Sequence, residues 1–477
     1  MERELRATAQ CICNSLPLSL EMPAGTGKTH LVAAIATIAA ETSKRTLILT
    51  HTHSGVDAIR RRLNRFGVSS RAVHVDTITG WAFDLARSYP LLAGTPIPAV
   101  PDWSRSAEYI AGATRVAGSS AIRDMHSVSF DYFIVDEYQD CNQNQHRFLL
   151  EIARAIPLTC VLGDRLQGIF RFRNEAPLVD WDVDVSSRFP PHAQTFEAQR
   201  WKGHNEVLGE WLLSIRPGLL LGLPLDLSAI SIAGLTWKTI DSASIVGEAL
   251  RSRPPGESVL LLGKWAADLD DLGRNLRGVY EVMEELQGKF MIEFLSLIDN
   301  SPATDHAFLL AQFAKKCFTG LAGIDAAVLR KLESGVTISH LSRPGIEVVQ
   351  QVLDSILTGS SLDALANAMG RISRAPNLKL FKREAWNDSR TAIENASGSE
   401  DISALEAFGR IRDSIRHRGR RIARRSVSRT LLVKGLEFDH VIIADADRLK
   451  DYANLYVALT RSRKTVTVFS RRSIISL

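Results

Sequence analysis

The residues with the clearest chemistry lie near the start of the chain, at residues 22–29. This segment reads Met-Pro-Ala-Gly-Thr-Gly-Lys-Thr, and its glycines let backbone N–H groups turn toward the oxygens of a phosphate. Lys28 would neutralise the outer phosphates of a nucleotide, and Thr29 would hold Mg²⁺. An apolar run precedes the segment and a helix-length pattern follows it, as a phosphate-binding loop requires. We therefore expect a nucleotide to be bound by Gly25, Thr26, Gly27, Lys28 and Thr29.

Two adjacent carboxylates, Asp136 and Glu137, end a second apolar run at residues 132–135. The first could hold Mg²⁺ and the second could take a proton from water, which are the two roles that nucleotide hydrolysis needs. An acidic pair after a strand is also common on solvated turns. The longer sequence Asp-Glu-Tyr-Gln-Asp at residues 136–140 is much more specific. We therefore expect Asp136 and Glu137 to act together with Lys28 and Thr29.

The elements that must position these residues follow from the pattern of apolar runs. Strand-length runs, each followed by a helix-length pattern, lie at residues 16–21, 45–50, 132–135 and 159–162. This alternation predicts a parallel sheet covered by helices. Runs at residues 258–263, 440–444 and 465–470 predict a second α/β unit. Between them, residues 290–405 lack strand alternation and predict amphipathic helices, among them residues 348–357 and 361–369.

Composition sets the class of protein. The chain has 477 residues, of which 45% are hydrophobic and 23% are charged, as in ordinary globular proteins of several domains. The five cysteines are scattered, which favours reduced thiols over a disulfide framework. The longest nearly apolar run, residues 31–40, has about half the length that a membrane helix needs. We expect a cytoplasmic protein that makes no membrane contact.

The acidic sequence at residues 136–140 resembles motif II of UvrD/Rep-type helicases of superfamily 1A, and the resemblance continues in order along most of the chain. Residues 50–53 resemble motif Ia, although His51 and His53 replace an aromatic residue and an asparagine. Residues 163–167 with 170–173 resemble motif III, and residues 199–201 resemble motif IV. Residues 434–438 match the core of motif V, and residues 456–463 closely resemble motif VI.

The resemblance implies an α/β fold of two RecA-like parallel-sheet domains with a mainly helical insertion in the second. Residues 1–190 would form the ATP-binding domain, with a short insertion at about 89–124. The second domain would comprise residues 191–289 and 406–477, and residues 290–405 would form the helical insertion.

The resemblance also implies how ATP is held and hydrolysed. The first domain would supply Lys28, Thr29, Asp136, Glu137 and Gln167, and the second would supply Arg200, Glu437 and Arg461. The arginines would stabilise charge on the transferred phosphoryl group. Gln10 is the candidate for the glutamine that reads adenine in this family, with a plain surface residue as the alternative. ATP and Mg²⁺ are the implied cofactors.

Single-stranded nucleic acid would be held by phosphate contacts and by side chains on which bases stack. Thr52, Thr77 and Thr79 are the candidate phosphate contacts, and Phe172 is the candidate for stacking, with a core position as its alternative. A run of arginines between residues 410 and 429 has only one acid, Asp413. A run of positive charges with almost no acids favours binding to a polyanion, and a solvated helix face is the alternative. Its candidate nucleic-acid contacts are Arg416, Arg418, Arg420 and Arg421.

The implied function is an ATP-dependent DNA translocase or helicase that moves 3′ to 5′ on single-stranded or forked DNA. The compact form resembles the helicase subunit of Gabija anti-phage systems, which implies a hetero-oligomer with a nuclease subunit and a role in antiviral defence. The alternative is a nucleotide-gated, DNA-binding regulatory subunit that activates a partner nuclease with little unwinding.

Overall fold

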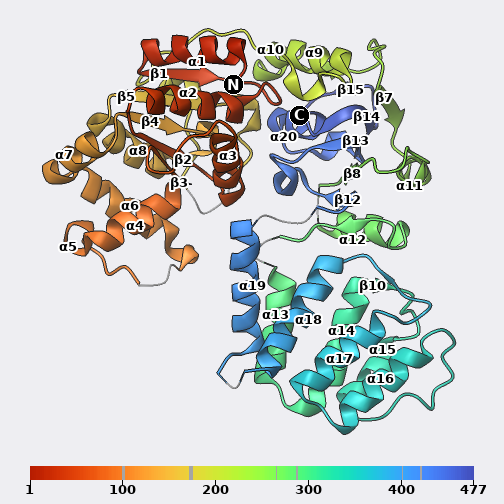
Figure 1. The fold of residues 1–477 in the computed structure, drawn as a ribbon. Helices are drawn as coiled ribbons and strands as arrows, with labels where there is room; N and C mark the ends of the chain where they lie inside the picture. Colours follow the sequence, from red (N-terminus) through yellow and green to blue (C-terminus); the bar gives the residue numbers. More distant parts are fainter. Residues whose placement is uncertain (99–101, 171–175, 265, 286–287, 400, 419–421) are drawn as a thin grey trace. The chain divides into compact units, whose positions relative to one another are not determined.

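The structure, a computed structural model, describes the chain except for residues 99–101, 171–175, 265, 286–287, 400 and 419–421. The chain divides into two compact units. Figure 1 shows the ribbon coloured by residue number. Unit 1 comprises Met1–Gly234, Leu449–Lys464 and Ile474–Leu477, and unit 2 comprises Leu235–Arg448 and Thr465–Ser473. In the described part of the chain, no helix is long and apolar enough to cross a membrane.

Unit 1 is built on a five-stranded sheet with the order β1-β5-β4-β2-β3, in which every neighbouring pair is parallel. The strands are β1 (Leu18–Glu21), β2 (Thr46–Thr50), β3 (Val73–Thr77), β4 (Tyr132–Val135) and β5 (Leu158–Gly163). Neighbouring side chains of one strand belong to cores on opposite faces: Leu47 packs in one core and Ile48 in the other. The sheet is therefore buried on both faces, as the continuous apolar runs predict.

Helices cover both faces of this sheet (Figure 1). The helices in this part of the chain are α1 (Arg3–Ser15), α2 (Lys28–Glu41), α3 (His53–Arg65), α4 (Ile78–Ser88), α5 (Pro90–Ala93), α6 (Ser106–Ala117), α7 (Ser120–Ser129) and α8 (Gln143–Ala155). Unit 1 also contains α9 (Glu206–Ser214), α10 (Arg216–Leu220) and α20 (Tyr452–Leu459), and an antiparallel pair of short strands, β6 (Leu225–Asp226) and β15 (Ile474–Ile475). The long apolar run at residues 31–40 lies in α2, whose residues 31–39 are all buried. It is a core helix.

Unit 1 also includes residues 191–234 and 449–464, while the domain boundary at residue 190 stays a prediction. A Cβ atom on Gly25 would lie only 2.6 Å from the ring of Trp201, so the 3₁₀ turn Gln199–Trp201 packs directly on the loop after β1. Further along, the Asn205 amide donates to the backbone oxygen of Lys464 at 2.8 Å. The first contact links residue 201 to the phosphate loop, and the second links residue 205 to residue 464.

Unit 2 contains a six-stranded sheet with the order β7-β14-β13-β8-β12-β9. Its strands are β7 (Leu235–Thr239), β8 (Val259–Leu262), β9 (Glu281–Val282), β12 (Arg425–Ser428), β13 (Phe438–Ile443) and β14 (Ser462–Ser470). The pairs β7–β14, β13–β8, β8–β12 and β12–β9 are parallel. The helices α11 (Ser242–Leu250) and α12 (Ala266–Asn275) precede and follow β8 in sequence.

The long segment between β9 and β12 is mainly helical. Its helices are α13 (Lys289–Asn300), α14 (His306–Cys317), α15 (Ala326–Glu333), α16 (Glu347–Thr358), α17 (Leu362–Ile372), α18 (Arg383–Ser397) and α19 (Ala404–Arg418). Two short strands, β10 (Phe318–Thr319) and β11 (Lys379–Leu380), pair antiparallel. The helices share one core, in which Phe313 stacks between Phe294 and Trp386 at ring-centroid distances of 4.0 and 5.7 Å. The predicted fold class, α/β with two parallel sheets and a helical insertion in the second, is confirmed, in agreement with two RecA-like domains.

Candidate nucleotide site

Three neighbouring strands of unit 1 bring the predicted catalytic residues together. The phosphate loop follows β1, the acidic sequence follows β4, and Asp164 follows β5, which lies between those two strands. Because the strands are parallel, all three segments leave the sheet at its carboxyl edge, which is where ligands bind in open α/β sheets. The topology therefore places Lys28, Asp136 and Gln167 at one edge.

The conformation of the loop depends on its two glycines. Gly25 has φ +76° and Gly27 has φ +91°, values that residues with a side chain rarely adopt. Gly27 is the N-cap of α2, so the first N–H groups of this helix face the loop. The Thr26 hydroxyl donates to the backbone oxygen of Pro23 at 2.8 Å and so supports the turn. Thr29 is half-buried in the first turn of α2. This arrangement suits a phosphate.

Lys28 lies against the acidic sequence. Its Nζ is 2.9 Å from Oε1 of Glu137 and 3.8 Å from Oδ1 of Asp136, and the lysine side chain is 10% exposed. Burial by itself lowers the pKa of a lysine, but the charges of Glu137 and Asp136 outweigh burial and raise the pKa of Lys28 above its ordinary value. The amine therefore remains a cation.

The two carboxylates differ in exposure and in backbone conformation. Asp136 is buried, and its Oδ1 accepts a hydrogen bond from the N–H of Glu137 at 2.9 Å. The side chain of Glu137 is more exposed, at 29% against 6% for Asp136. Glu137 has φ +58°, in the left-handed region that glutamate seldom occupies. Such strain is concentrated at functional sites, and here it aims the Glu137 carboxylate at Lys28.

Gln139 connects the acidic sequence to the end of β5. Its Nε2 donates to Oε2 of Glu137, and its Oε1 accepts from the N–H of Asp164 at 2.9 Å. The side chain fits closely, because a Cβ atom on Gly163 would lie 2.6 Å from Oε1 of Gln139. A movement of Glu137 would therefore be transmitted to Asp164.

Asp164, which we had not selected, contacts several segments of the site. It is completely buried. One oxygen, Oδ2, accepts from the N–H of Ala24 at 2.9 Å and from Nε2 of Gln167 at 2.8 Å. The other, Oδ1, is 2.8 Å from Nη1 of Arg216. Asp164 thus ties the phosphate loop to the predicted catalytic Gln167.

Arg216, also missed, is the cation that balances Asp164. Its other nitrogen, Nη2, donates to Oε1 of Glu21 at 2.8 Å, and its guanidinium lies 5.0 Å from the ring centre of Tyr456. Burial lowers the pKa of an arginine, but Asp164 and Tyr456 overcome burial and raise it. No signal in the sequence marks this residue, since a single arginine at the start of a short helix belongs to no motif.

The other predicted nucleotide contacts are placed as follows. The backbone N–H of Arg200 donates to the oxygen of Gly25 at 2.9 Å, and its guanidinium donates to the oxygen of Thr460. Arg461 is 1% exposed, and its Nε donates to the oxygen of Val457 at 2.9 Å. We expected both arginines from the second domain, whereas the structure places both in unit 1.

The last two nucleotide candidates are Gln10 and Glu437. Gln10 is exposed on α1 and donates from Nε2 to Oδ1 of Asn14 at 3.1 Å. Glu437 is exposed in unit 2, directly before β13. Their predicted contacts with ATP stay predictions.

Two of the threonine candidates cap helices at the same sheet edge. Thr52 is the N-cap of α3 and Thr77 is the N-cap of α4, and each side chain accepts from a backbone N–H three residues on. Their strands, β2 and β3, are neighbours, so both helices begin at the carboxyl edge. Thr52 is exposed and Thr79 is half-buried, but Thr77 is 5% exposed. Thr77 is therefore less available to a phosphate than Thr52.

The remaining nucleic-acid candidates are only partly covered by the structure. Phe172, Arg420 and Arg421 lie outside the described residues, and the side chains of Arg416 and Arg418 in α19 are not among those described. Other members of the arginine run already have partners. Arg412 is buried with its Nη1 2.7 Å from Glu384, and Arg429 pairs with Glu285. Arg412 and Arg429 are therefore engaged with acids, while nucleic-acid contacts by Arg416, Arg418, Arg420 and Arg421 stay a prediction.

Comparisons with known proteins agree with part of this assignment. Residues 100–178 match the family model described as the UvrD/REP helicase N-terminal domain, and this segment holds Asp136, Glu137 and Gln167. Among solved structures, the Pif1 helicase from Candida albicans is similar at 12% identity and a TM-score of 0.41, covering 100% of this chain and 96% of that chain. A TM-score this low assigns no function. No curated protein matches the sequence.

The Asp164–Arg216 pair predicts a specific effect on stability. Replacing Arg216 by methionine leaves a buried carboxylate without its cation, which typically costs about 3–5 kcal/mol. We expect Arg216→Met to reduce hydrogen-exchange protection in peptides that cover β1 and β5. Arg61→Met, which removes an exposed arginine of α3, is the matched control. Equal protection in the two variants would show that the pair does not stabilise the site.

Proposed function

We propose that this protein is an ATP-dependent DNA translocase or helicase whose hydrolytic centre lies at the carboxyl edge of the first sheet. The observation that carries the proposal is the contact of Lys28 Nζ with Glu137 at 2.9 Å and with Asp136 at 3.8 Å, directly behind the phosphate loop. A phosphate-binding cation and two carboxylates at neighbouring strand ends are the parts that nucleotide hydrolysis requires. The UvrD/REP match to residues 100–178 supports a helicase in preference to other nucleotide hydrolases.

The residues present fit ATP with Mg²⁺. The loop N–H groups and Lys28 would hold the phosphates, while Thr29 and the buried Asp136 would hold the metal. In the described part of the chain, no cluster of three or more histidine, cysteine, aspartate or glutamate side chains could hold a metal ion. Mg²⁺ usually takes one or two protein ligands together with phosphate oxygens and water, as Thr29 and Asp136 could provide. When bound, Mg²⁺ would neutralise charge on the phosphates.

Glu137 is the residue best placed to orient or deprotonate the attacking water. Its side chain is partly exposed, and its position is fixed by Lys28 and Gln139. Gln167, held by Asp164 at 2.8 Å, would respond to the outer phosphate, as would Gln139. Arg200 and Arg461 would stabilise negative charge in the transition state, and Glu437 and Gln10 would complete the nucleotide contacts.

Nucleic acid would bind near the first turns of α3 and α4, at the same sheet edge as the nucleotide site. Thr52 and Thr79 would contact phosphates there, together with helix N–H groups. Because this edge is shared, a change at Glu137 can alter the binding of a strand. The 3′ to 5′ direction, the cytoplasmic location, and an anti-phage assembly with a nuclease subunit are the finer parts of the proposal, and they rest on the resemblance to UvrD/Rep and Gabija proteins.

Two substitutions separate phosphate binding from water activation. Lys28→Ala should abolish ATP hydrolysis and weaken ATP binding, because it removes the cation that faces the phosphates. Glu137→Gln should lower turnover by about 10²- to 10⁴-fold and leave ATP binding near wild type, since Asp136 still holds the metal. Steady-state turnover and equilibrium binding of a fluorescent ATP analogue measure the two effects.

Lys202→Ala is the matched control for the lysine variant, because the Lys202 side chain is 67% exposed. It should behave as wild type in both assays. Near-normal turnover in Lys28→Ala would contradict the phosphate-loop assignment, and loss of ATP binding in Glu137→Gln would contradict the role of Glu137 as the base.

A strand-separation assay tests the finer proposal. With ATP and Mg²⁺, the wild-type chain should separate a duplex that carries a 3′ single-stranded tail and leave a duplex with a 5′ tail intact. Glu137→Gln should separate neither. ATP hydrolysis that is stimulated by DNA without any strand separation would instead support the alternative, a nucleotide-gated regulatory subunit.

A further inference from the structure

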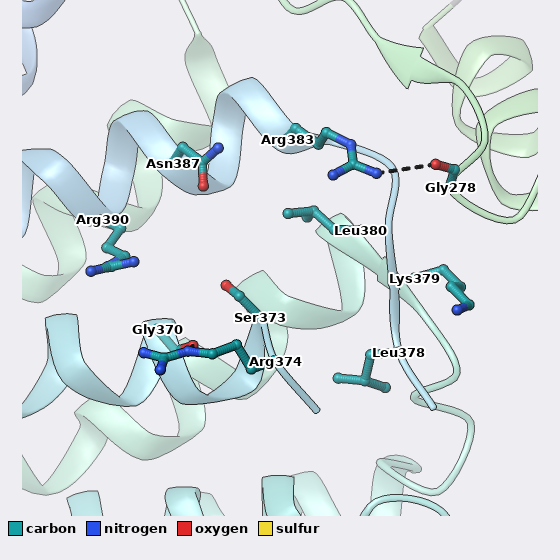
Figure 2. A pocket seen from close by; sticks show the side chains of 10 residues that line it. All are labelled: Gly278, Gly370, Ser373, Arg374, Leu378, Lys379, Leu380, Arg383, Asn387 and Arg390. Atoms are coloured by element: carbon teal, nitrogen blue, oxygen red, sulfur yellow. Dashed lines mark hydrogen bonds between the residues drawn. The ribbon is translucent and has the colours of Figure 1, made fainter. Parts of the chain in front are cut away.

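A cavity of about 430 Å³ lies in unit 2, where the helical insertion meets the segment before β9. Figure 2 shows the ten residues that line it. Four are basic, namely Arg374, Lys379, Arg383 and Arg390, and none of the ten is acidic. No residue that we assign to the nucleotide site is among them. A cavity with this lining is attractive to an anion.

Two of these arginines converge on one point. A Cβ atom added to Gly370 would lie 3.4 Å from Cζ of Arg390 and 3.5 Å from Nη2 of Arg374. Figure 2 shows both guanidinium groups beside Gly370. Both cations line the same pocket, so an anion bound there would be attracted to each of them.

The existing partners leave donors available in the pocket. Arg390 pairs with Glu394 one turn along α18, and Nε of Arg374 donates to the oxygen of Gly370 at 3.1 Å. Among the described side chains, Nε of Arg390 is buried without a hydrogen-bond partner. A guanidinium has five N–H donors, so one carboxylate does not saturate it.

The basic surface continues beyond this pocket. Arg383, which donates to the oxygen of Gly278 at 3.2 Å, also lines a second cavity of about 370 Å³ together with Arg253, Arg424 and Arg425. The second cavity contains two acids as well, and one of them, Glu257, is 2.6 Å from Nε2 of His440. Cations spread over two adjoining cavities suit a chain of phosphates better than a single phosphate.

We propose that the pocket around Arg374, Arg383 and Arg390 is a second phosphate-binding site, which holds the backbone of nucleic acid against the base of the helical insertion. Among the residues that the structure describes, no aromatic side chain lines either cavity, so no base would stack on them. The contact would be independent of sequence. The choice of nucleic acid as the source of phosphate rests on the proposed function, whereas the preference for phosphate rests on the pocket alone.

The test is the salt dependence of DNA binding by Arg374→Gln/Arg390→Gln, measured by fluorescence anisotropy on the full chain without ATP. The probes are a labelled single strand and a labelled blunt duplex. If the proposal is correct, affinity for at least one probe falls on the order of tenfold at 0.1 M salt. The slope of log affinity against log salt should fall by about 1.4 for the single strand or about 1.8 for the duplex, for two lost contacts.

The matched control is Arg330→Gln/Arg371→Gln, which removes the same charge from exposed positions on α15 and α17 outside the pocket. It should bind both probes as the wild type does. Thermal melting of both double variants should match the wild type, and so should ATP turnover without DNA, because these residues lie outside the Lys28 site. Absence of ATP turnover in the wild-type chain would contradict the proposed function without affecting this binding test.

Two results would overturn the inference. The first is an equal affinity and an equal salt slope for the pocket variant and its control on both DNA probes. The second is that the pocket variant binds both DNAs normally but loses binding of inorganic phosphate, measured by calorimetry, which would make the ligand a small anion. A lowered slope in the pocket variant alone supports the site.

Discussion

The first unit depends on the interactions of one buried carboxylate, that of Asp164. A completely buried charge is costly unless it is paired and hydrogen-bonded, and Asp164 has both a cation, Arg216, and several N–H donors. Each partner comes from a different segment of the chain. Asp164 therefore holds three parts of the unit in one geometry. They are the phosphate loop, which it contacts at Ala24, the predicted sensor Gln167, and the helix that begins at Arg216.

A second chain of contacts leads from this carboxylate to the reacting groups. Gln139 accepts from the N–H of Asp164 and donates to Glu137, which in turn contacts Lys28. Lys28 is the cation that would meet the outer phosphates of ATP. A change in those phosphates would alter the Lys28–Glu137 contact and, through Gln139, the end of β5. If a bound nucleotide changes the affinity of this edge for a second ligand, then by thermodynamic linkage that ligand changes the affinity for the nucleotide by the same factor.

Local sequence patterns predicted the parts of the site that depend on short-range rules. The run at residues 132–135 became β4, and the glycines at 25 and 27 adopt the positive φ that a phosphate loop needs. The pattern of helices in the insertion was also predictable, because α16 and α17 bury residues at helical spacing. The roles assigned to Lys28 and Glu137 remain predictions, but the structure brings these residues within 2.9 Å.

What sequence reasoning missed depends on contacts between distant segments. Arg216 meets Asp164 across 52 positions and Glu21 across 195, and no periodicity or motif encodes such a pairing. The same limit applies to Arg412 and Arg429, which looked like surface charges but are paired with acids from other elements. In unit 2, four basic residues that are unremarkable separately line one pocket.

The central claim is that a hydrolytic centre at the edge of the first sheet responds to nucleic acid bound near it. The most direct measurement is steady-state ATP turnover by the full wild-type chain as single-stranded DNA is added. The account predicts measurable turnover with Mg²⁺ that rises with DNA concentration and then saturates. Turnover that is absent, or that stays the same at every DNA concentration, would contradict it.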